Sequence, residues 1–276
     1  ISGGMYDLVK QIETISKRSD ASFFYNNKVK KILMKNNKIN GIELINNKVI
    51  DCDTIIFNGD PKALFDGLLG DEIQNAVSNN NINKRSLSAY VWSFAAKTQG
   101  LDLLHHNVLF NKNYKTEFDD IKRGEIPKDP TLYICAQGSI NNPKPKEKSL
   151  GRFEIIINGS PTYNHKRYNK QKEYTKCKEI TFSILESMGL KMDLKPTEEM
   201  LTTPKEFDQL FPGSQGSLYG RTPHGISSTF MRPRNKSKIK GLMLAGGGTH
   251  PGAGIPMACL SGKHAAEMIL KDLSLT

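Results

Sequence analysis

The chain has 276 residues, 37% of them hydrophobic, and its 39 Lys and Arg residues against 28 Asp and Glu give a net charge of +11. This length and apolar content allow one large domain or two ordinary ones. Gly (23) and Cys (4) are too few for a collagen-like chain or a disulfide framework, and the mean hydropathy of −0.47 argues against a polytopic membrane protein.

The first third predicts a helix followed by a β-meander. Apolar residues recur at helical spacing near the N-terminus, at Met5, Leu8, Ile12 and Ile15. Three β-prone runs follow, over 29–34, 39–45 and 49–57, with Asn-Asn-Lys turns between them, and Asn tolerates the positive φ that a tight hairpin needs. Asp60 and Pro61 then open a helix to about residue 69, as its N-cap and first residue.

The middle of the chain mixes strands with loops. Strands are predicted over 88–96, 131–136 and 152–157. A long helix is expected from about residue 166 to 188, and Gly189 is placed to end it.

The C-terminal segment is the most informative part of the sequence. Residues 241–262 contain no Asp, Glu, Lys or Arg, but seven glycines and two prolines argue against a membrane span. A buried strand over 242–245, a glycine turn and a helix over about 256–270 fit better. Such a turn brings backbone N–H groups and the positive end of a helix close to a ligand, which predicts an anion or cofactor site. A packing turn without a ligand remains the alternative, and the P-loop pattern is absent.

The cysteines and the charge give weaker signals. Cys52, Cys135, Cys177 and Cys259 form no C-x-x-C pair, so we predict no metal site and no disulfide, but reduced thiols in a cytoplasmic protein. Nearly all of the positive excess lies after residue 140, including six basic residues and no acid over 221–240. Attraction to anionic lipid and a bias toward Lys and Asn are the two interpretations kept, because no aromatic-interleaved platform for nucleic acid is present.

The run A-G-G-G-T-H-P-G-A-G-I-P over 245–256 resembles the C-terminal flavin signature of bacterial-type phytoene desaturases and related carotenoid dehydrogenases, which are FAD-dependent amine-oxidase-like oxidoreductases. Further similarity lies in His105-His106-Asn107 and in the stretches 3–5, 29–32, 41–44, 57–61, 117–121 and 129–133. Gly213 to Arg221, taken with the C-terminal run, looks most like the hydroxycarotenoid 3,4-desaturase (methoxyneurosporene dehydrogenase) branch.

The resemblance implies an FAD site, position by position. Val29 matches the valine whose backbone meets the adenine side of FAD. The glycines against the ribityl and pyrophosphate region correspond to Gly246, Gly247 and Gly248. The turn beneath the isoalloxazine, whose N–H groups can stabilise anionic reduced flavin, corresponds to Gly254, Ile255, Pro256 and Met257. Two residues would border the substrate near the ring, Tyr219 and His250, although a structural, hydrogen-bonded role stays open for His250.

The resemblance also implies an α/β (mixed α+β) fold, with an FAD-binding Rossmann-like domain interleaved with a substrate domain of β-sheet and helices. We expect residues 1–20 to join the two regions, 21–60 and 236–276 to belong to the FAD-binding domain, and 61–235 to form the substrate domain. The family's N-terminal Gly-rich βαβ unit is missing here. We therefore expect a piece of a longer protein, an expectation that the first residue, Ile1, and the lack of a signal peptide also favour, and one that binds FAD poorly and is inactive alone.

The implied activity is desaturation of a carotenoid, either phytoene or a hydroxylated or methoxylated neurosporene, with hydride transfer to flavin N5. The implied surroundings are the cytoplasm and a peripheral contact with the membrane surface; nucleic acid is not expected, and the oligomeric state is left open. Two alternatives remain: another FAD-dependent isoprenoid or retinoid oxidoreductase or isomerase, and a non-catalytic isoprenoid-binding protein on the same scaffold.

Overall fold

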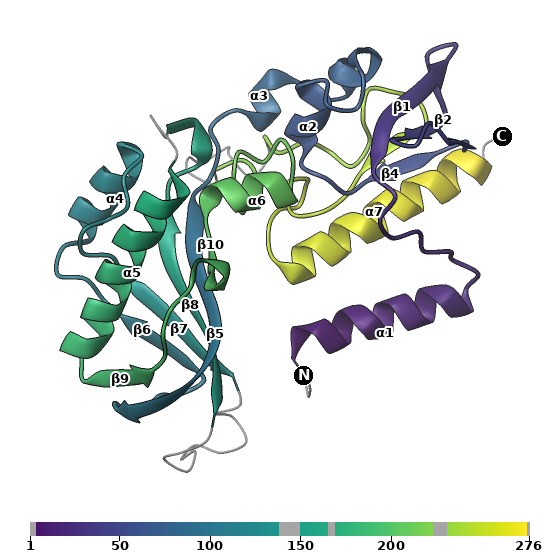
Figure 1. Ribbon diagram of the computed structural model, residues 1–276. Helices are drawn as coiled ribbons and strands as arrows, with labels where there is room; N and C mark the ends of the chain where they lie inside the picture. Colours follow the sequence, from purple (N-terminus) through teal and green to yellow (C-terminus); the bar gives the residue numbers. More distant parts are fainter. Residues whose placement is uncertain (1–3, 138–149, 165–168, 223–230, 275–276) are drawn as a thin grey trace.

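The computed structural model describes residues 4–137, 150–164, 169–222 and 231–274. Within these ranges the strands form three sheets: three antiparallel strands in the order β1-β2-β3, six strands in which β10-β5-β8-β7-β6 are joined by β9 on β5, and the parallel pair β11-β4 (Figure 1). Helices and strands are mixed along the chain, which confirms the predicted fold class.

The N-terminal helix and the meander form where the sequence predicts them. Helix α1 (Met5–Arg18) precedes β1 (Val29–Lys35), β2 (Lys38–Leu44) and β3 (Val49–Asp51). Asn36, Asn37 and Asn47 adopt φ values of 51°, 59° and 64° in the turns, so the Asn-rich turns do use left-handed backbone.

The prediction of one strand over 49–57 is wrong. The run divides at Cys52–Thr54, and β4 (Ile55–Phe57) leaves the meander to pair in parallel with β11 (Leu242–Leu244). Ile55 donates a backbone hydrogen bond to the Gly241 carbonyl over 2.8 Å. A local pattern cannot reveal a partner that lies almost 190 residues further along the chain.

A hydrophobic core joins this parallel pair to the meander and to three short helices. The helical segments are α2 (Pro61–Phe65), the 3₁₀ turn η1 (Asp71–Ala76) and α3 (Asn79–Ile82). The helix predicted to reach residue 69 therefore stops earlier. The core contains residues from all of these elements, among them Ile32, Ile39, Leu64, Ile73, Ile82, Leu242 and Leu244. Residues 61–82 thus pack with the segments assigned to the FAD side, and the functional domain boundaries stay a prediction.

A second, larger core lies between the six-stranded sheet and the helices over one of its faces (Figure 1). The sheet consists of β5 (Ser88–Gly100), β6 (His106–Leu109), β7 (Leu132–Gln137), β8 (Gly151–Gly159), β9 (Leu190–Asp193) and β10 (Leu201–Thr202). Its central side chains, led by Trp92, are fully buried against α5 (Lys170–Ser187). The sequence predicted β5, β7 and β8 but missed the shorter strands.

The remaining helical segments lie between strands along the chain, except for α7, which is the last element. They are α4 (Tyr114–Lys122), the 3₁₀ turns η2 (Thr162–Asn164) and η3 (Glu198–Met200), α6 (Pro204–Leu210) and α7 (Ile255–Ser274). Helix α5 begins at Lys170, while residues 166–168 of the predicted helix lie outside the described residues. Gly189, with φ +81°, follows its end as expected. None of the helices in the described ranges combines the length and apolarity needed to cross a bilayer.

Candidate functional site

The glycine turn, defined here as residues 246–254, connects β11 to α7 and packs against the connection from β4 to α2. A Cβ on Gly246 would lie 2.6 Å from Asn58 Oδ1, and one on Gly248 would lie 2.8 Å from the Cδ atom of Pro61. These two glycines are therefore required by the close approach of two protein segments, whatever else lies beside them.

The end of the turn at the start of α7 is built differently. Gly254 has φ +102°, yet a Cβ there would meet no atom of the described residues within 4 Å. Its neighbours Ile255, Pro256 and Met257 are exposed. The first N–H groups of a helix have no intrahelical acceptor, so Ile255 and Met257 direct donors and a positive helix end toward an open surface. Only backbone conformation, not crowding by the protein, requires glycine at 254.

A buried amide holds the turn in place from below. Asn235 donates to the carbonyl oxygen of Leu244 (3.0 Å) and to the carbonyl and hydroxyl oxygens of Ser261 (3.0 and 2.8 Å). The Gly246 N–H donates to the same hydroxyl over 3.2 Å. Strand β11, the turn and helix α7 are thereby joined through one side chain that is 3% exposed.

Beneath the turn lies an arginine cluster, defined as Arg85, Arg221 and Arg232, that sequence reasoning missed. Arg232 donates to the carbonyls of Gly247 (2.9 Å) and Arg221 (3.0 Å). Arg85 forms a buried ion pair with Asp60 and donates to the Ser214 carbonyl. Burial lowers the pKa of the Arg232 guanidinium, as do the charges of Arg85 and Arg221, while Asp60 opposes this effect.

Among the described residues the cluster combines three guanidinium groups with one carboxylate, Asp60, which pairs with Arg85, so the net charge beside the glycine turn is positive. The sequence contained a partial signal, because Arg221 and Arg232 belong to the basic run 221–240, which was interpreted as lipid contact or composition. Both are buried, at 7% and 5% exposure, so neither can contact a membrane. Asp60 does cap α2 as predicted, accepting from Lys62 N over 2.9 Å, and it also holds Arg85.

The remaining predicted site residues are divided between two places. Tyr219 is half exposed and lies beside the turn, because the adjacent Gly220 approaches Gly248 so closely that a Cβ would lie 3.0 Å from the Gly248 Cα. His250 lies within the turn, where its N–H donates to the Pro233 carbonyl over 2.8 Å and its bond to Pro251 is cis. Val29 begins β1 opposite Leu44, in a different sheet.

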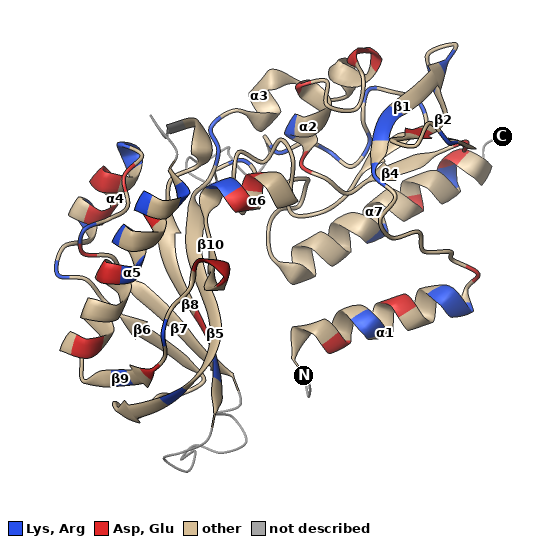
Figure 2. Cartoon of the chain, in the orientation of Figure 1, with Lys and Arg blue, Asp and Glu red and all other residues tan. Residues whose placement is uncertain are grey.

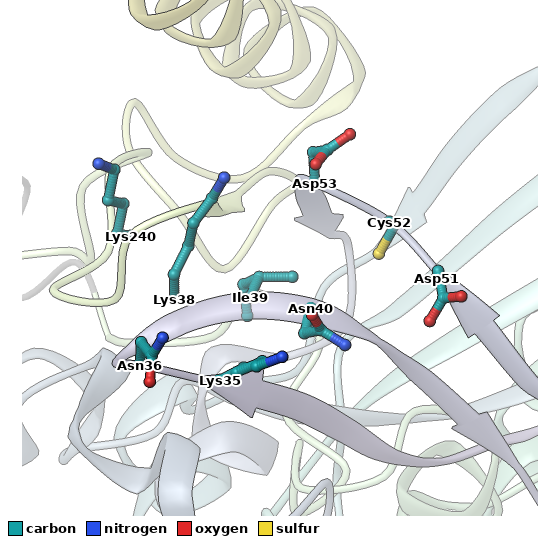
Figure 3. A pocket seen from close by; sticks show the side chains of 9 residues that line it. All are labelled: Lys35, Asn36, Lys38, Ile39, Asn40, Asp51, Cys52, Asp53 and Lys240. Carbon is teal, nitrogen blue, oxygen red and sulfur yellow. The ribbon is translucent and has the colours of Figure 1, made fainter.

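A hollow on the meander side is polar. Its lining combines lysines and aspartates around Cys52, with Lys38 and Lys240 side by side in Figure 3. The lining residues are Lys35, Asn36, Lys38, Ile39, Asn40, Asp51, Cys52, Asp53 and Lys240. Such charged walls do not suit an apolar ligand.

A strand–glycine turn–helix unit, whose strand β11 pairs in parallel with β4 from far upstream, is the feature that the family comparison has to account for. The family model for flavin containing amine oxidoreductase matches residues 1–270, and the chain belongs to this family.

Individual similar proteins belong to a narrower group within this family. The chain is 44% identical to the hydroxyneurosporene desaturase of Cereibacter sphaeroides and 42% identical to that of Rhodobacter capsulatus, over 99% of this chain and 54% of each relative. A 1-hydroxycarotenoid 3,4-desaturase of a Flavobacterium species is 29% identical over 97% of this chain and 54% of its own length. The chain thus spans about half the length of these relatives.

A solved oxidoreductase structure from Methanosarcina mazei has the same fold, with a TM-score of 0.54 and 14% identity over 96% of this chain and 54% of that one. The flavin that the family implies fits the residues present. Among the described residues nothing crowds the Cβ position of Gly254, the first turn of α7 offers the N–H groups of Ile255 and Met257, and the arginine cluster supplies positive charge. Thr249 Oγ1 is also buried without a hydrogen-bond partner among the described residues.

Proposed function

We propose that this protein is an FAD-dependent desaturase of a hydroxylated carotenoid. The observation that carries the proposal is the pair of relatives named hydroxyneurosporene desaturase, which are 44% and 42% identical over 99% of the chain. The 1-hydroxycarotenoid 3,4-desaturase at 29% identity supports the same substrate class.

FAD supplies the hydride acceptor in this reaction, and the chain's own residues position and stabilise it. The N–H groups of Ile255 and Met257 would donate to the ring side of the cofactor, with Gly254 providing a surface free of Cβ. The arginine cluster would favour negative charge next to the turn. Tyr219 and His250 would border the polyene, and Val29 would meet the adenine side.

The test compares two glycines of the same segment. Gly254→Val places a β-branched residue at φ +102°, whereas Gly262→Ala lies within α7 at an open position with no positive φ. The protein, expressed from its full-length gene in a host that accumulates neurosporene and its hydroxylated derivatives, should add double bonds to the pigment. Gly254→Val should reduce bound flavin and pigment conversion at least tenfold, and Gly262→Ala should leave both unchanged.

The pigments distinguish the alternatives. Conversion of neurosporene itself but not of its hydroxylated derivative would indicate that the substrate is a carotenoid without the hydroxyl group. A change of isomer without loss of hydrogen would indicate an isomerase, and bound carotenoid without conversion would indicate a binding protein. Either of these last two results refutes the desaturase proposal.

We further propose a peripheral contact with anionic membranes, which suits a substrate that resides in lipid. Arg234, Lys236, Lys238 and Lys240 are exposed at alternate positions of the segment 234–240, while the residues between them are buried or partly buried. Lys and Arg elsewhere are spread over both halves of the structure (Figure 2). Replacing these four with Gln should weaken binding to anionic vesicles at least tenfold at low salt. Vesicle binding that changes neither with the salt concentration nor with the four substitutions would contradict this proposal.

A further inference from the structure

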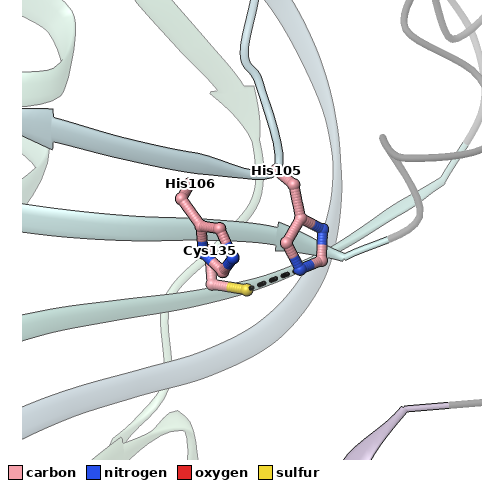
Figure 4. A group of neighbouring side chains, drawn as sticks. All are labelled: His105, His106 and Cys135. Carbon is pink, nitrogen blue, oxygen red and sulfur yellow. Dashed lines mark hydrogen bonds between the residues drawn. The ribbon is translucent and has the colours of Figure 1, made fainter. Parts of the chain in front are cut away.

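Two histidines and a cysteine lie close together at β6, an edge strand of the six-stranded sheet, away from the glycine turn. His106 begins β6 and lies opposite Cys135 of β7 in the antiparallel register, so both side chains project from the same face. The neighbouring His105 is held beside them because its carbonyl accepts the Ala136 N–H over 2.9 Å. Figure 4 shows the two rings and the thiol gathered at one point.

The spacing of the three groups is close to that of a tetrahedral metal site. One potential ligand atom from each residue lies within 4.8 Å of the others, and His105 Nε2 is 3.8 Å from Cys135 Sγ. The imidazole rings are nearly perpendicular, at 82°, with centroids 4.3 Å apart. Ligand atoms on a tetrahedral Zn²⁺ are about 3.3 to 3.8 Å apart, so a shift of roughly 1 Å would complete the site.

The surroundings also favour coordination. His106 Nδ1 lies 2.7 Å from the Tyr133 hydroxyl, which can fix the ring tautomer and leave Nε2 free as a ligand. Among the described residues, the His105 side chain has one hydrogen-bond partner, the Cys135 sulfur, and its Nδ1 is buried without any. A sulfur contact of 3.8 Å holds an imidazole weakly, so the His105 ring keeps its capacity to bind a metal ion.

We propose that His105, His106 and Cys135 bind a zinc-type divalent cation that joins β6 to β7. Two imidazoles and a thiolate select Zn²⁺ over Mg²⁺ or Ca²⁺, which require oxygen ligands. Glu154 of β8, opposite Cys135 in the register, adds negative charge nearby, and a fourth coordination position remains for water. The sequence predicted no metal site because the ligands are brought together by strand pairing, not by a short spacing motif.

Titration of the tag-free, full-length protein with Co²⁺ tests the site, because a cobalt–thiolate bond gives a charge-transfer absorption. We expect one equivalent of Co²⁺, displaced by Zn²⁺, with that absorption lost in Cys135→Ser and affinity reduced at least tenfold in His105→Asn and His106→Asn. Tyr133→Phe should weaken binding about tenfold. The matched control is Cys259→Ser, which removes an exposed thiol in α7 and should change nothing.

Far-UV circular dichroism checks that each variant is folded, and Cys135→Ala provides a second variant if Cys135→Ser is not. Zn²⁺ should also raise the melting temperature of the wild type but not of the Cys135 variants. Absence of a charge-transfer band, or a band that survives in the Cys135 variants, would overturn the proposal.

Discussion

The buried ion pair between Asp60 and Arg85 should dominate the stability of the region beneath the glycine turn. The two side chains are 8% and 4% exposed, and Arg221 and Arg232 add positive charge nearby. Removing the carboxylate leaves buried guanidinium charge without compensation, which typically costs about 3–5 kcal/mol. Asp60 also caps α2 through Lys62 N, a contact that contributes about 1 kcal/mol.

Two substitutions separate these contributions. Asp60→Asn keeps a side-chain oxygen for the cap and loses only the charge, so it should reduce the free energy of unfolding by about 3 kcal/mol, near the lower end because Arg85 retains the Ser214 carbonyl. Asp60→Ala should cost about 1 kcal/mol more. The matched control is Asp66→Ala, which removes a carboxylate that is 33% exposed from its pair with Lys62 and should cost at most about 0.5 kcal/mol.

Urea unfolding followed by far-UV circular dichroism measures these differences, because the single tryptophan, Trp92, reports only on the core of the six-stranded sheet. A loss below about 1 kcal/mol for Asp60→Asn would refute the reasoning, since it would mean that water replaces the carboxylate at little cost. Asp60→Asn should also lower flavin content, because Arg85 loses the ion-pair partner that positions it beside the turn.

Two further predictions concern thiols and pH. Cys259 is exposed and should react first with a thiol reagent, while Cys177, whose pKa burial raises to about 12, should react only after unfolding; early modification of Cys177, located by mass spectrometry, would contradict this. Burial raises the pKa of Glu206, but hydrogen bonds from Lys170 and the Thr203 backbone hold it below its ordinary 4.5, so its contribution is present above that value and is lost as pH falls. Glu206→Gln should therefore cost up to about 1 kcal/mol at pH 7, and a cost in urea unfolding that is undiminished well below pH 4.5 would argue against the charge.

Local signals in the sequence predicted the elements that are local in structure. Helix α1 follows from apolar spacing, the hairpins from Asn residues that take positive φ, and the end of α5 from Gly189. The predicted start of α7 differs by one residue from the observed Ile255. In each of these cases the deciding interactions lie within a few residues of chain.

What the sequence could not predict depends on contacts between distant segments. The division of 49–57 is caused by β11, which competes with the meander for β4. Arg85 and Arg232 are 147 positions apart, and nothing in their local sequence distinguishes a buried cation from a surface one. The glycine signature was recognisable because it is contiguous, whereas its charged support was not.

The glycine turn and the arginine cluster are best understood as one unit. Three buried guanidinium groups beside one carboxylate are tolerable because each also donates to backbone carbonyls, those of Ser214, Gly247 and the loop at Asn83. The carbonyl of Gly247 is oriented by Arg232, and Gly248 must lack a Cβ because the Asp60–Pro61 segment lies against it. Arg232 therefore both fixes the backbone of the turn at Gly247 and contributes to the positive charge beside it. Asp60 offsets only one of the three arginine charges. Negative charge on a cofactor at the start of α7 would therefore be stabilised by the positive charge that remains.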